Sequence, residues 1–172
     1  MNVFIFIGGN KHFTAARLGV KLGEELQQKG FKVSLACVKG KLKAGTALPV
    51  YEYAAAAKPK TLANTLKKEH ADFVISFMNL SGCAAAQEAG LPFAYAENES
   101  FKEDKPSKDK KSLLKKAKQV FVIKTSDKPL NKKTYSGLKV HEVTNPAVWV
   151  EHYNYNKPAC FKKENNIVAV GK

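Results

Sequence analysis

The sequence has few cysteines, and their spacing gives none of them an obvious partner. Cys37, Cys83 and Cys160 are odd in number and lie far apart in the 172 residues. This pattern argues against a disulfide framework and against a zinc site with closely spaced ligands. The histidines likewise lack the spacing of metal ligands. We therefore expect reduced thiols, no bound metal and no cofactor.

Long hydrophobic runs and nucleotide-binding fingerprints are also missing. No apolar run approaches the roughly 18 residues that a membrane-spanning helix needs, and no basic segment precedes the first apolar run. We therefore expect a cytoplasmic protein. Neither the G-x-G-x-x-G dinucleotide fingerprint nor the G-x-x-x-x-G-K-[ST] phosphate loop occurs. Their absence disfavours an NAD-type oxidoreductase.

Acidic residues are scarce: 15 Asp and Glu stand against 29 Lys and Arg, a formal net charge of +14. Such a balance predicts an anionic partner, which is nucleic acid, a phosphorylated small molecule or the surface of an anionic membrane. The lysines are barely interleaved with aromatic residues, which argues against nucleic acid. A basic Rossmann-like module that binds nucleic acid or another polyanion is the alternative to the function developed below.

Lysines concentrate in the segment 101–118, whose second half, 108–118, is expected to be a basic helix. The simplest interpretation is a solvated surface without a ligand. The other interpretation is a patch that binds a membrane or another anion. In that case the protein would lie at the inner face of the membrane. The lysines of this patch would be Lys108, Lys110, Lys111, Lys115, Lys116 and Lys118.

What is present is a regular alternation of apolar strands and amphipathic helices. The run 3–7 is apolar on both faces, and a helix ending before Gly30 leads to a second strand at 31–38. Further strands are expected at 49–53, 73–77, 91–96, 119–123 and 138–143, and further helices at 61–70, 82–88 and 108–118. Strand, helix and strand in this order predict right-handed parallel crossovers. The fold class is therefore α/β, a Rossmann-like doubly wound parallel sheet with helices on both faces.

Two polar stretches follow buried strands and are candidates for function. Gly8, Gly9, Asn10 and Lys11 join the first strand to the first helix, where free amides favour a phosphate. The alternative is that the glycines only form a tight turn. The second stretch, residues 97–99, follows the strand at 91–96 at the edge where open α/β sheets build ligand sites. The candidate catalytic residues are Glu97, Asn98 and Glu99.

The order of the parts resembles the N-terminal, acceptor-side domain of a retaining, nucleotide-sugar-dependent glycosyltransferase with the GT-B fold. The resemblance covers nearly the whole chain and depends on short motifs in a fixed order. These are Gly8-Gly9, the step at 29–33, the Asp-led strand at 71–75, the Gly-Leu-Pro at 90–92, Ser126-Asp127, Asn145-Pro146 and the strand with a Gly-Lys end at 167–172. Many members place a histidine where this chain has Glu97-Asn98-Glu99. No histidine role is therefore carried over.

The resemblance implies a division of labour between two domains. Residues 1–165 would form the acceptor-binding domain, and 166–172 would begin a truncated C-terminal donor domain, without which the chain is inactive. The nucleotide-sugar donor would be a substrate held mainly by that second domain, with residues 8–11 closing onto its diphosphate. The acceptor, a sugar, lipid-linked or phosphate-bearing molecule, would contact residues 97–99. The remaining residues of the implied acceptor pocket are Asn79, Ser126 and Asn145.

Overall fold

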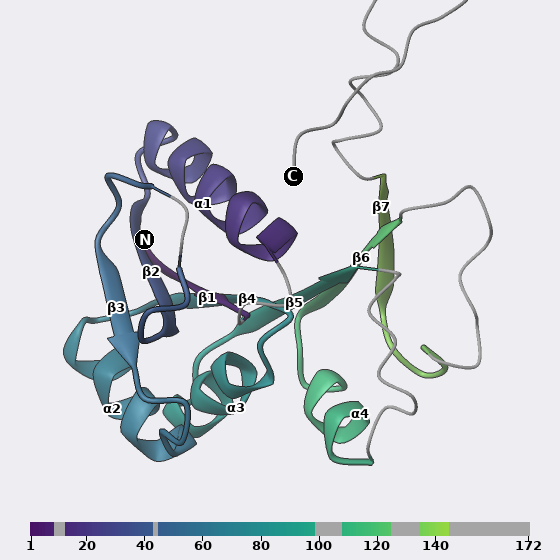
Figure 1. The fold of residues 1–172 in the computed structure, drawn as a ribbon. Helices are drawn as coiled ribbons and strands as arrows, with labels where there is room; N and C mark the ends of the chain where they lie inside the picture. The colour runs from purple at the N-terminus through teal and green to yellow at the C-terminus, as the bar shows by residue number, and fades with distance from the viewer. Residues whose placement is uncertain (9–12, 43–44, 99–107, 125–134, 145–172) are drawn as a thin grey trace, which may run out of the picture.

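The computed structural model describes residues 1–8, 13–42, 45–98, 108–124 and 135–144. These residues form one seven-stranded sheet in which every strand pair is parallel, in the order β3-β2-β1-β4-β5-β6-β7 (Figure 1). The strands are β1 (Asn2–Ile7), β2 (Lys32–Val38), β3 (Val50–Tyr53), β4 (Phe73–Phe77), β5 (Phe93–Asn98), β6 (Gln119–Lys124) and β7 (Val140–Thr144). The helices are α1 (Phe13–Gln28), α2 (Pro59–Lys68), α3 (Leu80–Ala89) and α4 (Lys108–Leu114).

The central strand β1 shows why the sheet needs helices on both faces. All six of its residues are buried, and successive side chains point to opposite faces. Phe4 and Phe6 belong to a core shared with α2, α3 and α4, whereas Ile5 and Ile7 belong to a core shared with α1. The predicted Rossmann-like sheet with helices on both faces is therefore confirmed.

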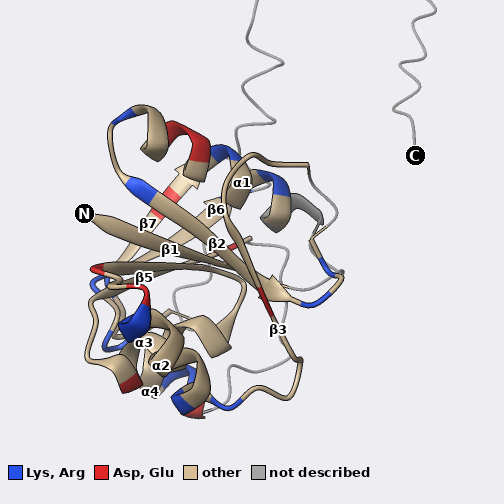
Figure 2. Cartoon of the chain, turned by 90° about the vertical axis from the view of Figure 1, so that its left-hand side faces the viewer, with Lys and Arg blue, Asp and Glu red and all other residues tan. Residues whose placement is uncertain are grey.

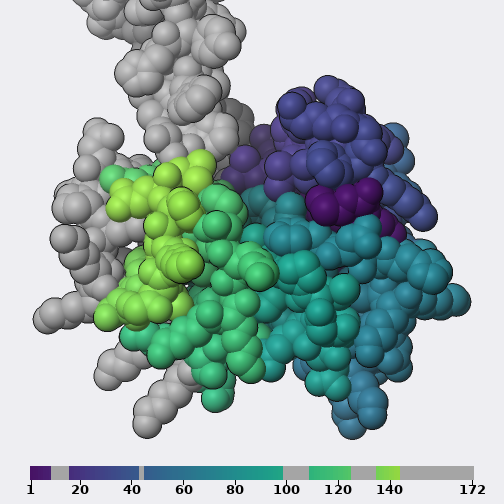
Figure 3. Space-filling view, turned by 180° about the vertical axis from the view of Figure 1, so that it is seen from behind, coloured from purple at the N-terminus to yellow at the C-terminus, as the bar shows by residue number. Residues whose placement is uncertain are grey.

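Most charged residues lie outside this core; the described exceptions are Glu97 and Lys110, which are buried. Lys and Arg lie on the helices and at the ends of strands, and the inner strands are mostly uncharged (Figure 2). In the space-filling view from behind, residues 135–144 pack beside α4 and β6 at one side of the molecule (Figure 3). None of the helices in the described ranges is long and apolar enough to cross a membrane.

Three helices have bounds that differ from the predicted ones. Helix α2 begins at Pro59 instead of residue 61, because proline is tolerated in the first turn of a helix. Helix α3 begins at Leu80 instead of Gly82, because the Asn79 side chain caps it by accepting a hydrogen bond from the Gly82 amide. Helix α4 ends at Leu114 instead of residue 118, because the Lys118 amide already donates to the Phe93 carbonyl at the start of β5.

Several predictions fall outside the described residues. These are the domain boundary at 165–166, the strand at 167–172 and the residues Gly9, Asn10, Lys11, Glu99, Ser126 and Asn145. They stay predictions.

Candidate functional site

The carboxyl ends of β1 and β4 border the point where the strand order reverses. From β1 the chain runs outward through β2 to β3, and from β4 it runs the other way to β7. Open α/β sheets bind ligands in the crevice outside such a switch point. Gly8 directly follows β1, and Asn79 is the second residue after β4.

Gly8 lies against the chain that leaves β4. Its amide donates to the Phe77 carbonyl at 2.8 Å. A Cβ on Gly8 would lie 2.7 Å from the Met78 carbonyl oxygen, which is closer than a Cβ can approach. Glycine is therefore required here for the close contact of two backbones. This contact explains structurally why residue 8 is glycine. The role of Gly8 in binding a phosphate stays a prediction.

Asn79 joins four elements at the same edge. Its side-chain amide donates to the Ile7 carbonyl at 3.0 Å and to the Tyr53 hydroxyl at 2.7 Å. Its Oδ1 accepts from the Gly82 amide, and its own carbonyl accepts from the Ser76 hydroxyl. The side chain is buried and tied to β1, β3 and α3. Asn79 thus builds the edge of the sheet, and its predicted contact with an acceptor is not tested by these bonds.

Tyr53 was not predicted as part of this edge. Tyr53 is the last residue of β3, and its hydroxyl lies next to the Asn79 side chain. Burial raises the pKa of the Tyr53 hydroxyl above its usual value. The hydroxyl therefore stays protonated in the physiological range. Nothing in the local sequence around residue 53 signals this contact, because it depends on the distant Asn79.

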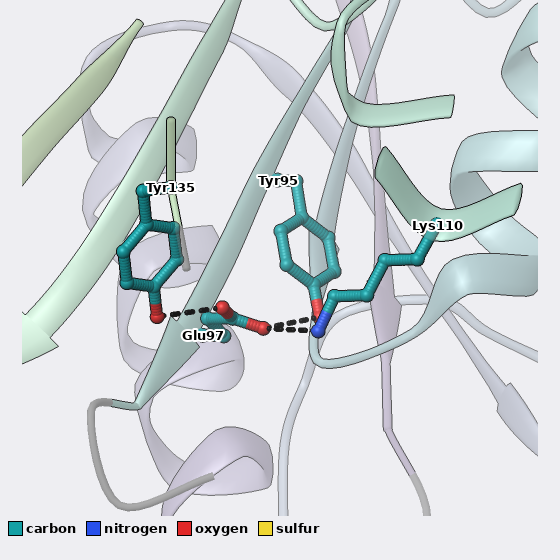
Figure 4. A network of polar contacts seen from close by, with 4 residues as sticks. All are labelled: Tyr95, Glu97, Lys110 and Tyr135. Carbon is teal, nitrogen blue, oxygen red and sulfur yellow. Dashed lines mark hydrogen bonds and ion pairs between the residues drawn. The ribbon is translucent and has the colours of Figure 1, made fainter. Parts of the chain in front are cut away.

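A second polar cluster lies at the carboxyl end of β5 (Figure 4). The Glu97 carboxylate accepts hydrogen bonds from the Tyr95 hydroxyl at 3.0 Å and from the Tyr135 hydroxyl at 2.9 Å. The Lys110 ammonium lies 2.9 Å from the same carboxylate. Glu97 is 2% exposed and Lys110 6%. A charge pair this deeply buried is tolerated only when both members are paired and hydrogen-bonded.

The cluster joins segments that follow different strands. Tyr95 and Glu97 share one face of β5 because they are two residues apart. Lys110 lies in the first turn of α4, and Tyr135 precedes β7. The Lys110 ammonium also lies 5.7 Å from the centre of the Tyr95 ring. The alternation along β5 indicates that Tyr95 and Glu97 are neighbours, but no sequence signal identifies Lys110 or Tyr135.

These contacts change the interpretation of three predicted residues. Lys110 was expected in an exposed basic patch, and that prediction is wrong for this residue, because its ammonium is drawn inward to the buried Glu97 carboxylate. Glu97 is held among three donors and does not line an open pocket in this arrangement. Asn98 is half-buried and points to the other face of β5.

The other patch lysines separate into two groups. Lys111 is half-buried, whereas Lys115, Lys116 and Lys118 are exposed beyond the end of α4. The side chain of Lys108 lies outside the described residues. Within the described ranges, no group of three His, Cys, Asp or Glu residues could hold a metal ion.

The described part of the site places Gly8, whose amide donates to the Phe77 carbonyl, and the half-buried Asn98 at one edge of the sheet. The buried Glu97 pair supports this edge from the opposite face of β5.

The fold is shared with glycosyltransferases of known structure. MurG from Acinetobacter baumannii matches with a TM-score of 0.64 and 16% identity, over 91% of this chain and 50% of that one. UGT73P12 from Glycyrrhiza uralensis, solved with glycyrrhetinic acid 3-O-monoglucuronide, matches with a TM-score of 0.54 and 10% identity, over 88% of this chain and 50% of that one. Both are GT-B enzymes.

The chain thus has the fold of one Rossmann-like domain of a GT-B glycosyltransferase, as the order of its motifs predicted. It spans about half the length of these two structures. The sequence matches no protein-family model. No curated protein is similar to it in sequence.

Proposed function

We propose that this chain is the acceptor-binding half of a glycosyltransferase that moves a sugar from a nucleotide-sugar donor to an acceptor with retention. The observation that carries the proposal is the match of 91% of the chain to half of MurG. A domain that supplies only one wall of a cleft is inactive without the other. Retention is supported by the resemblance of the short motifs alone.

In this proposal the carboxyl edge of the sheet faces the reaction. The departing diphosphate gains negative charge, which backbone amides and cations stabilise best when they are fixed in advance. Gly8 directly follows β1 at this edge, and it and residues 9–11, which precede α1, would supply the amides and the cation. Asn98 is the described residue best placed to hold an acceptor hydroxyl, because its amide both donates and accepts hydrogen bonds.

Glu97 takes a positioning role in this proposal. Its carboxylate holds Lys110 and Tyr135 and thereby fixes where α4 begins and where the chain approaches β7. The Glu97 carboxylate is already occupied by three donors, so it is not open to an acceptor hydroxyl. We therefore remove Glu97 from the predicted acceptor contacts, retain Asn98 among them and keep Asn79 as support for the same edge.

An anionic membrane is the proposed location of the acceptor. The support is the net charge of +14 and the exposed lysines after α4. A peripheral position at the inner face of the membrane would suit a lipid-linked acceptor. The alternative is a basic module that binds nucleic acid. It is supported by the same net charge, and no further observation favours it.

A ligand titration followed by amide resonances tests the proposal. The ¹⁵N-labelled chain is titrated with saccharides, with polyprenyl-phosphate-linked sugars and with UDP-, GDP- and ADP-linked hexoses. We expect saturable shifts at Gly8, Asn79 and Asn98 from an acceptor, and no sugar transfer by the chain alone. The Asn98→Ala variant should lose the shifts, and the Asn64→Ala variant, altered at an exposed position of α2, should keep them.

Two results would contradict the proposal. One is saturable binding of saccharides only at surfaces away from the carboxyl edge. The other is equal binding by the Asn98→Ala and Asn64→Ala variants.

A further inference from the structure

A second feature lies at the opposite edge of the sheet from the candidate site. Between the end of α4 and the turn before β7 there is an open hollow of about 350 Å³. Four of the eight residues that line it are lysines, namely Lys115, Lys116, Lys118 and Lys139. The green atoms of α4 and β6 and the yellow-green atoms of 135–144 adjoin on this face of the molecule (Figure 3).

The backbone under these lysines is fixed by the sheet. The Lys118 amide donates to the Phe93 carbonyl at 2.8 Å, and the Lys139 carbonyl accepts from the Val120 amide at 3.3 Å. Both bonds are at the amino ends of strands. Because α4 starts beside the carboxyl end of β5 and runs back, its far end reaches the amino edge.

Apolar anchors and a tight turn complete the frame. Leu114 is buried at the end of α4, and Leu138 packs against the same core. The turn before β7 is closed by the Leu138 amide, which donates to the Tyr135 carbonyl at 3.0 Å. Within this turn Gly137 has φ 78, a conformation that glycine adopts without strain. The hollow is therefore held by buried side chains and backbone bonds on both sides.

Among the described residues, no carboxylate faces the positive charge of this hollow. All four lysines are exposed. None of the described residues that line the hollow is acidic. The ion pairs seen in the described ranges involve Lys21, Lys110 and Lys124 instead. Lysines just beyond a helix stabilise its carbonyl end, which accounts for Lys115 and Lys116. It does not account for Lys139, which a separate turn brings to the same place.

We propose that this hollow binds a multiply charged phosphate group. Ammonium groups bind phosphate as point charges, and several of them around one concave surface raise the local concentration of anions. The phosphate belongs either to the headgroup of an anionic lipid or to a soluble diphosphate. The site differs from the patch expected from the sequence, because it excludes Lys110 and includes Lys139. It lies at the other edge of the sheet from the residues proposed for sugar transfer, and in its lipid form it rests on the membrane position proposed above.

Two probes separate the two sources of phosphate. The first is a suspension of vesicles of phosphatidylglycerol and phosphatidylcholine, followed by co-sedimentation. The second is inorganic pyrophosphate, followed by the amide shifts of Gly137, Leu138 and Lys139. The test variant carries Lys→Gln at positions 115, 116, 118 and 139. The matched control carries Lys→Gln at four exposed lysines at the opposite edge, at positions 39, 41, 58 and 60.

The matched variants make the outcome clear, because each loses the same net charge. We expect the test variant to bind the vesicles, the pyrophosphate or both at least about tenfold more weakly than the control, with an effect that fades as salt is raised. Loss with vesicles alone assigns the lipid headgroup, and loss with pyrophosphate alone assigns the soluble anion. Equal binding by the two variants, or no binding of either probe by the unchanged chain, overturns the proposal. Circular dichroism confirms that both variants are folded.

Discussion

At the scale of single residues, the buried pair of Glu97 and Lys110 dominates the electrostatics of the described core. Both side chains are almost fully removed from water. Since an isolated buried charge is costly, each member depends on the other. This explains how a sequence rich in surface lysine can keep one lysine inside.

The Glu97→Gln substitution should therefore be strongly destabilising. It keeps the shape of the side chain but leaves the Lys110 ammonium buried without a counter-charge. We expect a loss of about 3 kcal/mol in the free energy of unfolding, measured with urea. The double variant Glu97→Gln with Lys110→Met should recover much of this loss, because it removes the unpaired charge.

The control for this pair is an exposed one. Lys21 and Glu25 lie 3.1 Å apart on α1 with side chains 67% and 48% exposed. Glu25→Gln should change stability by less than about 0.5 kcal/mol. Similar losses for Glu97→Gln and Glu25→Gln would contradict the importance of the buried pair.

Asn79 is the second residue whose removal should be costly. Asn79→Ala deletes the cap of α3 and the hydrogen bonds to Ile7 and Tyr53. We expect a loss of about 2 kcal/mol in urea unfolding, because a lost cap and unpaired buried groups add together. Asn64→Ala, at an exposed position of α2, should be nearly neutral. Equal midpoints for the two variants would show that the Asn79 bonds contribute nothing.

At the scale of elements, the strands β1 and β4 must approach closely at the switch point. Their contact depends on Gly8, and α3 lies so near β1 that a Cβ on Gly82 would be 2.5 Å from Phe6. The Met78 carbonyl beside Gly8 is backbone and the Phe6 side chain beside Gly82 is buried, so neither contact is relieved by a simple side-chain rotation. The geometry of the candidate site thus depends on small residues at element junctions.

The Gly8→Ala substitution tests this dependence. The added methyl group would meet the Met78 carbonyl, so β1 and the chain after β4 must separate. We expect about 1–3 kcal/mol of destabilisation and shifted amide resonances at Phe77 and Asn79. In Gly45→Ala the new methyl group meets nothing within 4 Å, and the spectrum should stay unchanged elsewhere. Unchanged resonances at Phe77 and Asn79 in Gly8→Ala would contradict the contact.

At the scale of the whole molecule, burial of weakly acidic groups should set the alkaline limit of stability. Burial raises the pKa of the Cys83 thiol from 9.0 to about 12 and raises that of Cys37 as well. The unfolded thiols lose their protons above about pH 9, whereas the folded ones keep them. The free energy of unfolding should therefore be unaffected below pH 9 and fall as pH rises from 9 to 12.

Urea unfolding at several pH values between 8 and 11 measures this effect. The Cys83→Ala variant should lose less stability over the range than the unchanged chain, because one titrating thiol is gone. Only the slopes with pH are compared, since the substitution itself also changes packing. Parallel slopes for the two proteins would contradict the buried, protonated thiol.

The sequence by itself determined the fold class. Strands apolar on both faces, separated by amphipathic helices, leave a parallel sheet covered on both sides as the structure that buries them. The periodicity placed all seven described strands, and the stop at Gly30, which adopts φ 85, marked the end of α1. These signals are local, so a reader of the sequence can recover them.

The tertiary structure alone decided which polar residues meet. Lys110 lies 13 residues from Glu97 and Tyr135 lies 38 residues from it, so no local pattern pairs them. The same holds for Lys139, which a separate turn brings beside the lysines after α4. Periodicity specifies which face of an element is buried, but contacts between polar groups depend on how the elements are placed. This is why Lys110 was expected at the surface and lies in the core.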